Sequence, residues 1–218
     1  NNAASSRDLI ECAVAAGVRH FIFSSTAAVY GGAVAGAINE EALKAPASPY
    51  GRSKLMTEWM LEDTAAASGL RYVALRYFNV AGADPQGRTG QSTPKATHLI
   101  KRACQTVLGR VPYLGIFGTD YPTPDGTGIR DYIHVSDLVA AHALALDHLR
   151  GGGDSGVYNC GYGHGFSVRQ VVASVERVSG HSVTVREMPR RAGDPAAIVS
   201  DPAKLKAALG WTPEHDSL

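Results

Sequence analysis

Long apolar stretches are missing from this sequence. No run approaches the ~20 consecutive apolar residues that a helix needs to cross a bilayer, and the N-terminus lacks the basic and then apolar pattern of a secretory signal peptide. Cysteine is also scarce, because Cys12, Cys104 and Cys160 show neither a C-x-x-C pair nor the spacing of metal ligands. This pattern is typical of buried free thiols in a reducing compartment. We therefore expect a soluble, cytoplasmic protein with no membrane segment and no metal site.

An excess of charge of either sign is missing as well. The chain has 21 Lys and Arg residues against 20 Asp and Glu residues, which gives a net charge of +1. This balance gives no reason to expect nucleic acid or an anionic membrane as a partner. With 218 residues, 44% of them hydrophobic, the chain is long enough for one large or two small domains with a real core.

A glycine-rich phosphate-binding turn is the third absence. The glycines of the loop at residues 30–47 do not follow a strand in G-x-G-x-x-G or G-x-x-G-x-x-G spacing. Such a turn presents backbone N–H groups at a helix N-terminus, where they bind phosphate. The sequence therefore contains no predicted cradle for the phosphates of a dinucleotide.

The run SPYGRSK at residues 48–54 is the most informative feature that is present. Ser48 suits the cap of a helix and Pro49 suits its first position, so Tyr50 and Lys54 share one helical face. A free phenol has a pKa of ~10. The positive end of the helix dipole and the ammonium of Lys54 would both lower the pKa of Tyr50. The pair is a plausible tyrosinate base, although Tyr and Lys at this spacing are more often structural.

Helices and strands alternate along the chain. We predict helices at residues 1–17, 49–69, 97–108, 136–149, 167–179 and 201–209, and strands at 19–23, 71–77, 114–117, 130–135, 157–159 and 182–188. This alternation is typical of an α/β fold with a parallel sheet. Leu9, Ile10, Ala13 and Val14 give the first helix an apolar stripe. No strand precedes that helix, so we expect part of the fold to lie upstream.

Polar side chains follow two of the predicted strands. Ser24, Ser25 and Thr26 come directly after residues 19–23, and Asn79 follows residues 71–77. Ligands bind at the carboxyl ends of parallel strands in open α/β sheets. The bland alternative is an ordinary turn whose hydroxyls satisfy the backbone, and for Ser24, Ser25 and Thr26 taken alone it is the better interpretation.

The charged residues near the C-terminal half have bland interpretations too. Alternation along residues 130–135 puts Arg130 and His134 on one face of a strand. From the residues alone, Arg130 beside Asp131 indicates a strand-end ion pair, and His134 indicates a hydrogen-bonded core residue. Arg191, in a loop, indicates a solvated surface.

Several separated motifs nevertheless agree with one family. The runs SSTAAVYG at 24–31, YGRSK at 50–54 and RYFN at 76–79 resemble the extended short-chain dehydrogenase/reductases. The run FGTDYPTPDGTGIRDYIHV at 117–135, with YNCG at 158–161 and RRAGD at 190–194, is narrower and resembles the UDP-glucose 4-epimerase family. The similarity covers essentially the whole chain in order.

This resemblance implies a fold and a division of the chain. The fold is α/β, namely the C-terminal part of a Rossmann-type parallel sheet plus a smaller mixed α/β substrate domain. Residues 1–82 would be a partial Rossmann-type NAD-binding and catalytic portion, and residues 83–218 mostly a UDP-sugar-binding portion, with the chain crossing between the two. The expected partners are a UDP-hexose substrate and a second copy of the chain, because family members are commonly homodimers through the helix that carries Tyr50. In that helix Trp59, Met60 and Leu61 would suit such a contact.

The resemblance also implies a reaction, the reversible NAD-dependent epimerisation of UDP-galactose to UDP-glucose at C4 through a 4-keto intermediate. Tyr50 would be the base, Thr26 would hydrogen-bond the same hydroxyl, and Lys54 would hold the nicotinamide ribose. A secondary alcohol gives up hydride readily only as its proton leaves, so the chemistry needs these groups together. Phe78 would lie near the nicotinamide and Asn1 on the cofactor side.

For the nucleotide, the resemblance places Arg130 and Arg191 on the diphosphate, where a guanidinium can pair two oxygens at once. Asp194 would accept hydrogen bonds from the uridine ribose. The remaining implied contacts are the base-lining residues Gly115, Ile116 and Phe117, the sugar-phosphate contact Asn79, the substrate-binding residue His98, and Ile198 at the hexose end of the pocket. The family often has Asn at the position of His98. At the position of Ile198 a tyrosine narrows the pocket, so we expect some tolerance for UDP-N-acetylhexosamines.

The chain also departs from the family pattern. Members begin with a strand and a glycine-rich turn that this sequence lacks, and they continue beyond the position of Leu218 into another helix. We therefore expect a part of a longer protein, and we predict that residues 1–218 alone are unstable and bind NAD weakly.

Two other functions stay open. One is a sister enzyme, such as a nucleotide-sugar dehydratase or a UDP-glucuronate epimerase. Dehydratases generally have acidic residues where this chain has Ala27 and Ala28, which disfavours that alternative. The other is a non-catalytic UDP-sugar-binding remnant, suggested by the absent glycine-rich turn.

Overall fold

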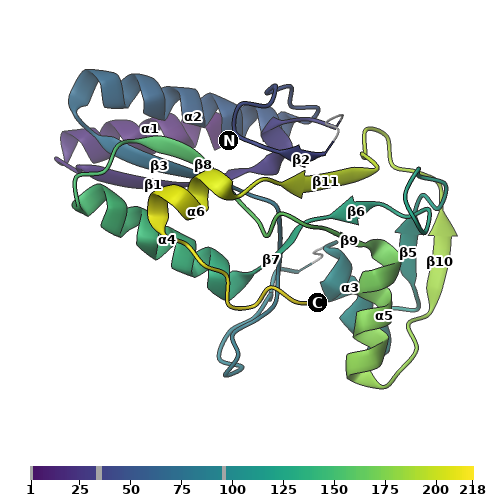
Figure 1. The fold of residues 1–218 in the computed structure, drawn as a ribbon. Helices are drawn as coiled ribbons and strands as arrows, with labels where there is room; N and C mark the ends of the chain where they lie inside the picture. Colours follow the sequence, from purple (N-terminus) through teal and green to yellow (C-terminus); the bar gives the residue numbers. More distant parts are fainter. Residues whose placement is uncertain (1, 33–35, 95–96) are drawn as a thin grey trace.

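The computed structural model describes residues 2–32, 36–94 and 97–218 (Figure 1). Its helices are α1 (Asn2–Ala15), α2 (Pro49–Ser68), α3 (Leu99–Val107), α4 (Val135–Arg150), α5 (Val168–Ser179) and α6 (Ala203–Leu209), with a short 3-10 helix η1 (Ala27–Val29). Its strands are β1 (His20–Thr26), β2 (Ala37–Ile38), β3 (Arg71–Tyr77), β4 (Asn79–Ala81), β5 (Leu114–Phe117), β6 (Ile129–Arg130), β7 (Tyr132–His134), β8 (Gly156–Cys160), β9 (Phe166–Ser167), β10 (Val185–Met188) and β11 (Ala197–Ser200).

A parallel sheet in the order β1-β3-β8 forms one half of the molecule. Figure 1 shows α1 and α2 on one face of this sheet and α4 on the other, with α6 beside β8. The carboxyl ends of β1 and β3 lie at the same edge, since Thr26 is paired with Tyr77. The α/β class and the parallel sheet predicted from the sequence are therefore confirmed.

Two apolar layers hold the helices on this sheet. On one face, Val73 and Leu75 of β3 pack with Leu138 and Ala141 of α4. On the other face, the neighbouring strand residues Tyr72 and Ala74 pack with Ile10 of α1 and Leu61 of α2. Successive side chains of a strand point to opposite faces, so one apolar run serves both layers.

The other half is built from short strands and two helices. A four-stranded sheet has the order β2-β11-β6-β9, and the pairs β10-β5 and β4-β7 are both parallel. Helices α3 and α5 pack together over β5, with Ala103, Leu114 and Val172 in their shared core. The chain does not divide cleanly at residue 82, because α4, β8 and α6 return to the first sheet (Figure 1).

Local signals explain where the helices begin and end. The Ser48 hydroxyl caps α2 by accepting from the backbone N–H of Gly51 at 3.1 Å, and α2 ends at Gly69, whose φ of 72° is left-handed. Ser167 and Gln170 form a reciprocal capping box at the start of α5, which ends at Gly180.

Three expectations from the sequence were wrong in detail. Leu9 belongs to the predicted apolar stripe of α1 but is 58% exposed, whereas Ile10 and Val14 of the same stripe pack in the cluster that contains Leu61 of α2. Cys12 and Cys104 are exposed, and Cys160 alone is buried. The strand predicted at residues 130–135 is interrupted at Asp131, so that β6 pairs with β11 and β9 while β7 pairs with β4.

The described residues contain neither a membrane-spanning helix nor a metal-ligand cluster. Over residues 2–32, 36–94 and 97–218, no helix is long and apolar enough to span a membrane. Over the same residues, no group of three or more His, Cys, Asp or Glu side chains could hold a metal ion.

Candidate functional site

The N-terminus of α2 lies directly against the end of β1. A Cβ atom added to Gly51 would come within 2.4 Å of the Ala28 carbonyl oxygen, so only glycine fits this contact between α2 and η1. Thr26 is the last residue of β1 and caps η1, where its hydroxyl accepts from the N–H of Ala28 at 3.2 Å. The first turn of α2, which carries Tyr50, is thereby held beside Thr26.

Lys54 reaches from α2 to the carboxyl end of β1. Its ammonium donates to the Ser24 carbonyl at 2.9 Å and lies 4.8 Å from the centre of the Phe23 ring and 5.9 Å from that of Tyr50. Burial lowers the pKa of Lys54. Tyr50 is 46% exposed. The structure therefore brings Thr26, Tyr50 and Lys54 to one edge of the sheet, with the phenol open to a ligand.

A second layer of polar groups lies under this edge. The Nδ1 atom of His142 is 2.8 Å from the Leu138 carbonyl, which can only accept, so we assign the proton to Nδ1. The Nε2 atom then accepts from the Ser24 hydroxyl at 3.1 Å. Burial raises the pKa of Tyr77, as does the nearby Tyr50, while a hydrogen bond with Ser24 opposes the shift. Sequence reasoning missed His142, because it lies 118 residues from Ser24.

A buried charged network adjoins the same helix. The Arg76 guanidinium donates to both carboxylate oxygens of Glu58, with Nη2–Oε2 at 2.6 Å and Nε–Oε1 at 3.0 Å. The Ser25 hydroxyl donates to Oε1 of Glu58. Arg76 also donates to the Tyr30 hydroxyl at 2.8 Å, which in turn donates to Asn159 at 2.7 Å. Burial raises the pKa of Tyr30 to about 12, although Arg76 opposes the shift.

A second cluster of predicted site residues lies in the other half of the molecule. Arg130 forms an ion pair with the carboxylate of Asp194, and the Tyr121 hydroxyl donates to the Asp194 carbonyl at 3.3 Å. The Arg191 guanidinium stacks 3.8 Å from the centre of the Phe117 ring. The structure therefore brings together two arginines, a carboxylate and an aromatic ring, which can bind the anionic, ribosyl and base parts of a nucleotide.

Asp131 supports Arg130 without pairing with it. Its buried carboxylate accepts from the backbone N–H groups of Tyr162, Gly163 and Ser200, at 2.9, 3.2 and 3.1 Å, and from the Ser200 hydroxyl at 2.6 Å. These bonds join the end of β8, the end of β11 and the junction of β6 and β7. The ion pair between Arg130 and Asp131 suggested by the residues alone was therefore wrong.

The remaining predicted contacts are spread around these two clusters. Ile198 of β11 is opposite Arg130 and packs on the buried cluster that contains Phe78, so this cluster connects the two halves. Asn79 is exposed, and its N–H donates to the Asp131 carbonyl at 2.9 Å. His98 is exposed at the start of α3, where its Nδ1 accepts from Gln91 at 2.5 Å. Asn1 lies outside the described residues.

The strand β5 presents its predicted site residues to two different sides. Ile116 is buried, whereas Gly115 and Phe117 are half-buried. A Cβ atom added to Gly115 would lie 3.2 Å from the Phe117 ring, so the glycine leaves room for that ring. Only Gly115 and Phe117 therefore share the side of Arg191.

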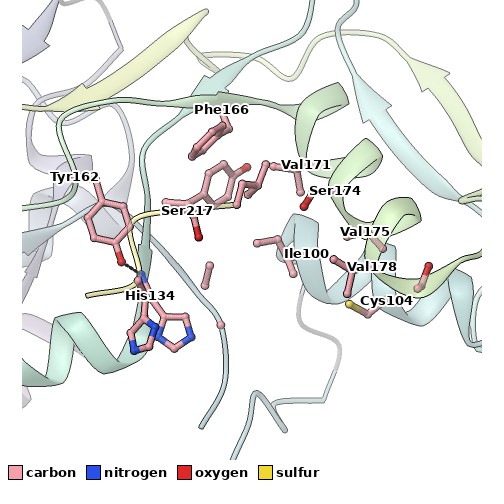
Figure 2. A pocket seen from close by; sticks show the side chains of 16 residues that line it. Ile100, Cys104, His134, Tyr162, Phe166, Val171, Ser174, Val175, Val178 and Ser217 are labelled. Carbon is pink, nitrogen blue, oxygen red and sulfur yellow. Dashed lines mark hydrogen bonds between the residues drawn. The ribbon is translucent and has the colours of Figure 1, made fainter. Parts of the chain in front are cut away.

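A separate cavity of about 330 Å³ lies between α3, α5, β7 and residues 215–218 (Figure 2). Its wall is mainly apolar, with Ile100, Val171 and Val175 on the helices, and the His134 and His215 rings lie 4.4 Å apart at one side. Among the residues that the structure describes, none of the predicted site residues lines this cavity.

Comparison with known proteins shows the family to which the chain belongs. The model of the NAD dependent epimerase/dehydratase family matches residues 1–161. The chain belongs to this family, so the family-level resemblance found in the sequence is confirmed.

Particular relatives are similar over the whole chain. The UDP-glucose 4-epimerase of Azospirillum brasilense is 60% identical over 218 residues, which are 100% of this chain and 63% of that protein. The crystal structure of UDP-glucose 4-epimerase from Brucella ovis in complex with NAD is 46% identical, with a TM-score of 0.97 over 100% of this chain and 67% of its own. The UDP-Glc/GlcNAc 4-epimerase of Campylobacter jejuni is 48% identical, with a TM-score of 0.83 over 100% of this chain and 66% of its own. The chain thus spans about two thirds of the length of these relatives.

Proposed function

We propose that this chain is the catalytic and UDP-sugar-binding part of an enzyme that interconverts UDP-galactose and UDP-glucose at C4. The observation that carries the proposal is the placement of Lys54 on the Ser24 carbonyl at 2.9 Å, with its ammonium 5.9 Å from the Tyr50 ring at the strand edge that ends in Thr26. The 60% identity to a UDP-glucose 4-epimerase over all 218 residues supports the choice of substrate.

Lys54 and Tyr50 fit the nicotinamide ribose of NAD. The ammonium of Lys54 has three N–H donors, and its bond to the Ser24 carbonyl uses one of them. Phe78 would lie near the nicotinamide, and Asn1 would lie on the cofactor side. When bound, NAD⁺ supplies an acceptor that takes hydride from C4 of the sugar and returns it. Lys54 and Tyr50 therefore fit the ribose end of the cofactor.

The protein's own task in the reaction is to move a proton. Tyr50 takes the proton of the 4-hydroxyl while the Thr26 hydroxyl holds the same oxygen in place. The 4-keto sugar then turns over in the site, and Tyr50 returns the proton to the carbonyl oxygen when the other face is reduced. Lys54 keeps a positive charge beside the phenol throughout.

The second cluster would hold the UDP group. Arg130 and Arg191 pair with the diphosphate, and Asp194 accepts from the uridine ribose. Phe117 and Gly115 offer a flat surface for the base. Arg130 is already paired with Asp194, so nucleotide binding exchanges part of this ion pair for contacts to the ligand.

Ile198 would set the tolerance of the pocket for the hexose. It is half-buried beside Phe78 and is smaller than a tyrosine, so a bulkier 2-substituent such as N-acetyl fits the pocket better. The 48% identity to a protein described as a UDP-Glc/GlcNAc 4-epimerase supports this proposal. We expect Ile198→Tyr to lower turnover of UDP-N-acetylglucosamine relative to UDP-glucose, measured by parallel assays. An unchanged ratio contradicts the role of Ile198.

The proposed protein partner is a second copy of the chain, and the proposed location is the cytoplasm. Trp59 and Met56 of α2 are exposed apolar side chains and would form the dimer contact. Met60, which the sequence also placed in this contact, is half-buried against the cluster that contains Leu61. Leu61, which the sequence placed in this contact, is buried against Ile10 within the same chain and is therefore excluded from it.

The first test is conversion of UDP-galactose to UDP-glucose by the purified full-length protein that contains this chain, with NAD⁺ added, because residues 1–218 alone are predicted to bind NAD weakly. We expect turnover that falls by about 10³-fold in Tyr50→Phe, within the range for loss of a general base. UDP affinity, measured by calorimetry in both proteins, controls for folding and is expected to stay equal. UDP binding without turnover in the wild-type full-length protein contradicts the proposed catalysis and favours a UDP-sugar-binding function.

A further inference from the structure

The face of α2 that carries Tyr50 and Lys54 continues into the buried ion pair. Tyr50, Lys54 and Glu58 follow one another at intervals of four residues, so they lie on one side of the helix. Tyr50 is exposed, Lys54 is half-buried and Glu58 is buried. Burial therefore increases along this face of α2 from Tyr50 to Glu58, and Glu58 is the most buried of the three residues.

The partners of Glu58 come from the segments that carry the other site residues. Ser25 immediately precedes Thr26 in β1, and Arg76 precedes Tyr77 and Phe78 in β3. Arg76 also donates to Tyr30, which ends η1. One network thus ties α2, β1, β3 and η1 together directly behind the ligand-facing edge.

The form of this contact favours positioning over simple attraction. A guanidinium accepts a carboxylate in a fixed, planar fork, and here both Glu58 oxygens are used, at 2.6 and 3.0 Å. Apolar side chains of the same volume would stabilise the fold about as well. They lack directional hydrogen bonds, however, so they would not fix α2 at one distance from the sheet and in one rotation about its axis.

We infer that Glu58 and Arg76 are positioning residues for the proposed epimerisation, and that their ion pair sets the height and rotation of α2 over the ends of β1 and β3. In this position the Lys54 ammonium donates to the Ser24 carbonyl and lies 5.9 Å from the centre of the Tyr50 ring. The inference rests on the proposed function, because it assigns the pair a role in that reaction.

The double variant Glu58→Met/Arg76→Met tests this role without leaving an unpaired buried charge. We expect its Tm and its affinity for UDP to stay close to those of the wild-type protein. Its kcat is expected to fall about 10²-fold with little change in KM for UDP-galactose, because a misplacement of about 1 Å costs this much. Glu62→Met, on the exposed next turn of α2, is the matched control and is expected to keep the wild-type kcat. Wild-type kcat in the double variant overturns the inference.

A crystal structure of the double variant gives a readout that does not depend on turnover. The distance from Lys54 Nζ to the Ser24 carbonyl is 2.9 Å in the wild-type chain, and we expect it to exceed 3.5 Å in the variant. A retained bond overturns the inference. If the wild-type chain binds UDP but has no epimerase activity, the proposed reaction fails, and this distance still decides whether the pair positions α2. If the double variant does not fold, Glu58→Gln keeps the shape of the side chain, and the same distance and kcat apply.

Discussion

Two Arg–carboxylate pairs in this molecule have different surroundings. Glu58 and Arg76 have side chains that are 4% and 3% exposed, and further hydrogen bonds surround them. Arg130 and Asp194 are 14% and 33% exposed, at the edge of the nucleotide cluster. A pair sealed from water is costly to open, whereas a pair at a rim can exchange its partner for a ligand. The comparison indicates that the first pair stabilises the fold, whereas the second can exchange its partner for a ligand, as the proposed UDP site requires.

Removing one member of the sealed pair gives the largest expected effect. We expect Glu58→Ala to lower the free energy of unfolding by about 3–5 kcal/mol, because it leaves the Arg76 charge buried without a carboxylate. Urea unfolding followed by circular dichroism measures this loss. Glu62→Ala is the control and is expected to stay within about 0.5 kcal/mol of wild type. Equal losses of unfolding free energy in Glu58→Ala and Glu62→Ala would show that the buried ion pair contributes no more to stability than an exposed carboxylate does.

Removing the arginine of the rim pair is expected to affect binding more than stability. We expect Arg130→Ala to weaken UDP binding by about 2 kcal/mol, or roughly 30-fold, since a charge-assisted contact to the diphosphate is lost. Isothermal titration calorimetry measures the affinity. Arg190→Ala is the control, because Arg190 is paired with the exposed Asp120 instead. A large loss of stability in Arg130→Ala without a loss of UDP affinity would show that Arg130, like Arg76, has a structural role.

Asp137 sharpens the comparison, because this carboxylate accepts only from uncharged donors. Burial opposes its ionisation, but the Tyr162 hydroxyl and the N–H groups of Glu214 and His215 outweigh burial and lower the pKa of Asp137. The pKa of Asp in an unfolded chain is ~3.9. The stabilisation is therefore complete above that value and is lost as the pH falls through the lower pKa of the folded state.

We expect the loss of these hydrogen bonds at low pH to have a small effect, confined to the backbone around Glu214 and His215. We predict lower protection factors at the Glu214 and His215 amides at acidic pH, calculated against the intrinsic exchange rate at each pH, before the sheet loses protection. Asp137→Asn should remove this pH dependence, since the amide does not titrate. A pH response that persists in Asp137→Asn would show that another group controls the segment.

The sequence determined the local geometry of the catalytic helix. Ser48 caps α2 and Pro49 occupies its first position, both as predicted, because these are properties of a few adjacent residues. The helical period alone then puts Tyr50 and Lys54 on one face. The strand at residues 71–77 was likewise predicted, and the order of the elements predicted the α/β class with its parallel sheet.

Which charged side chains form ion pairs depends on the tertiary structure. Arg130 stands next to Asp131 in the sequence but is paired with Asp194, 64 residues away, because Asp131 turns inward to three backbone N–H groups of two other segments. Arg76 and Glu58 come from a strand and a helix whose separation depends on how α2 packs. Periodicity reports which face of an element a side chain occupies. Which other element covers that face depends on contacts that are distant in the sequence.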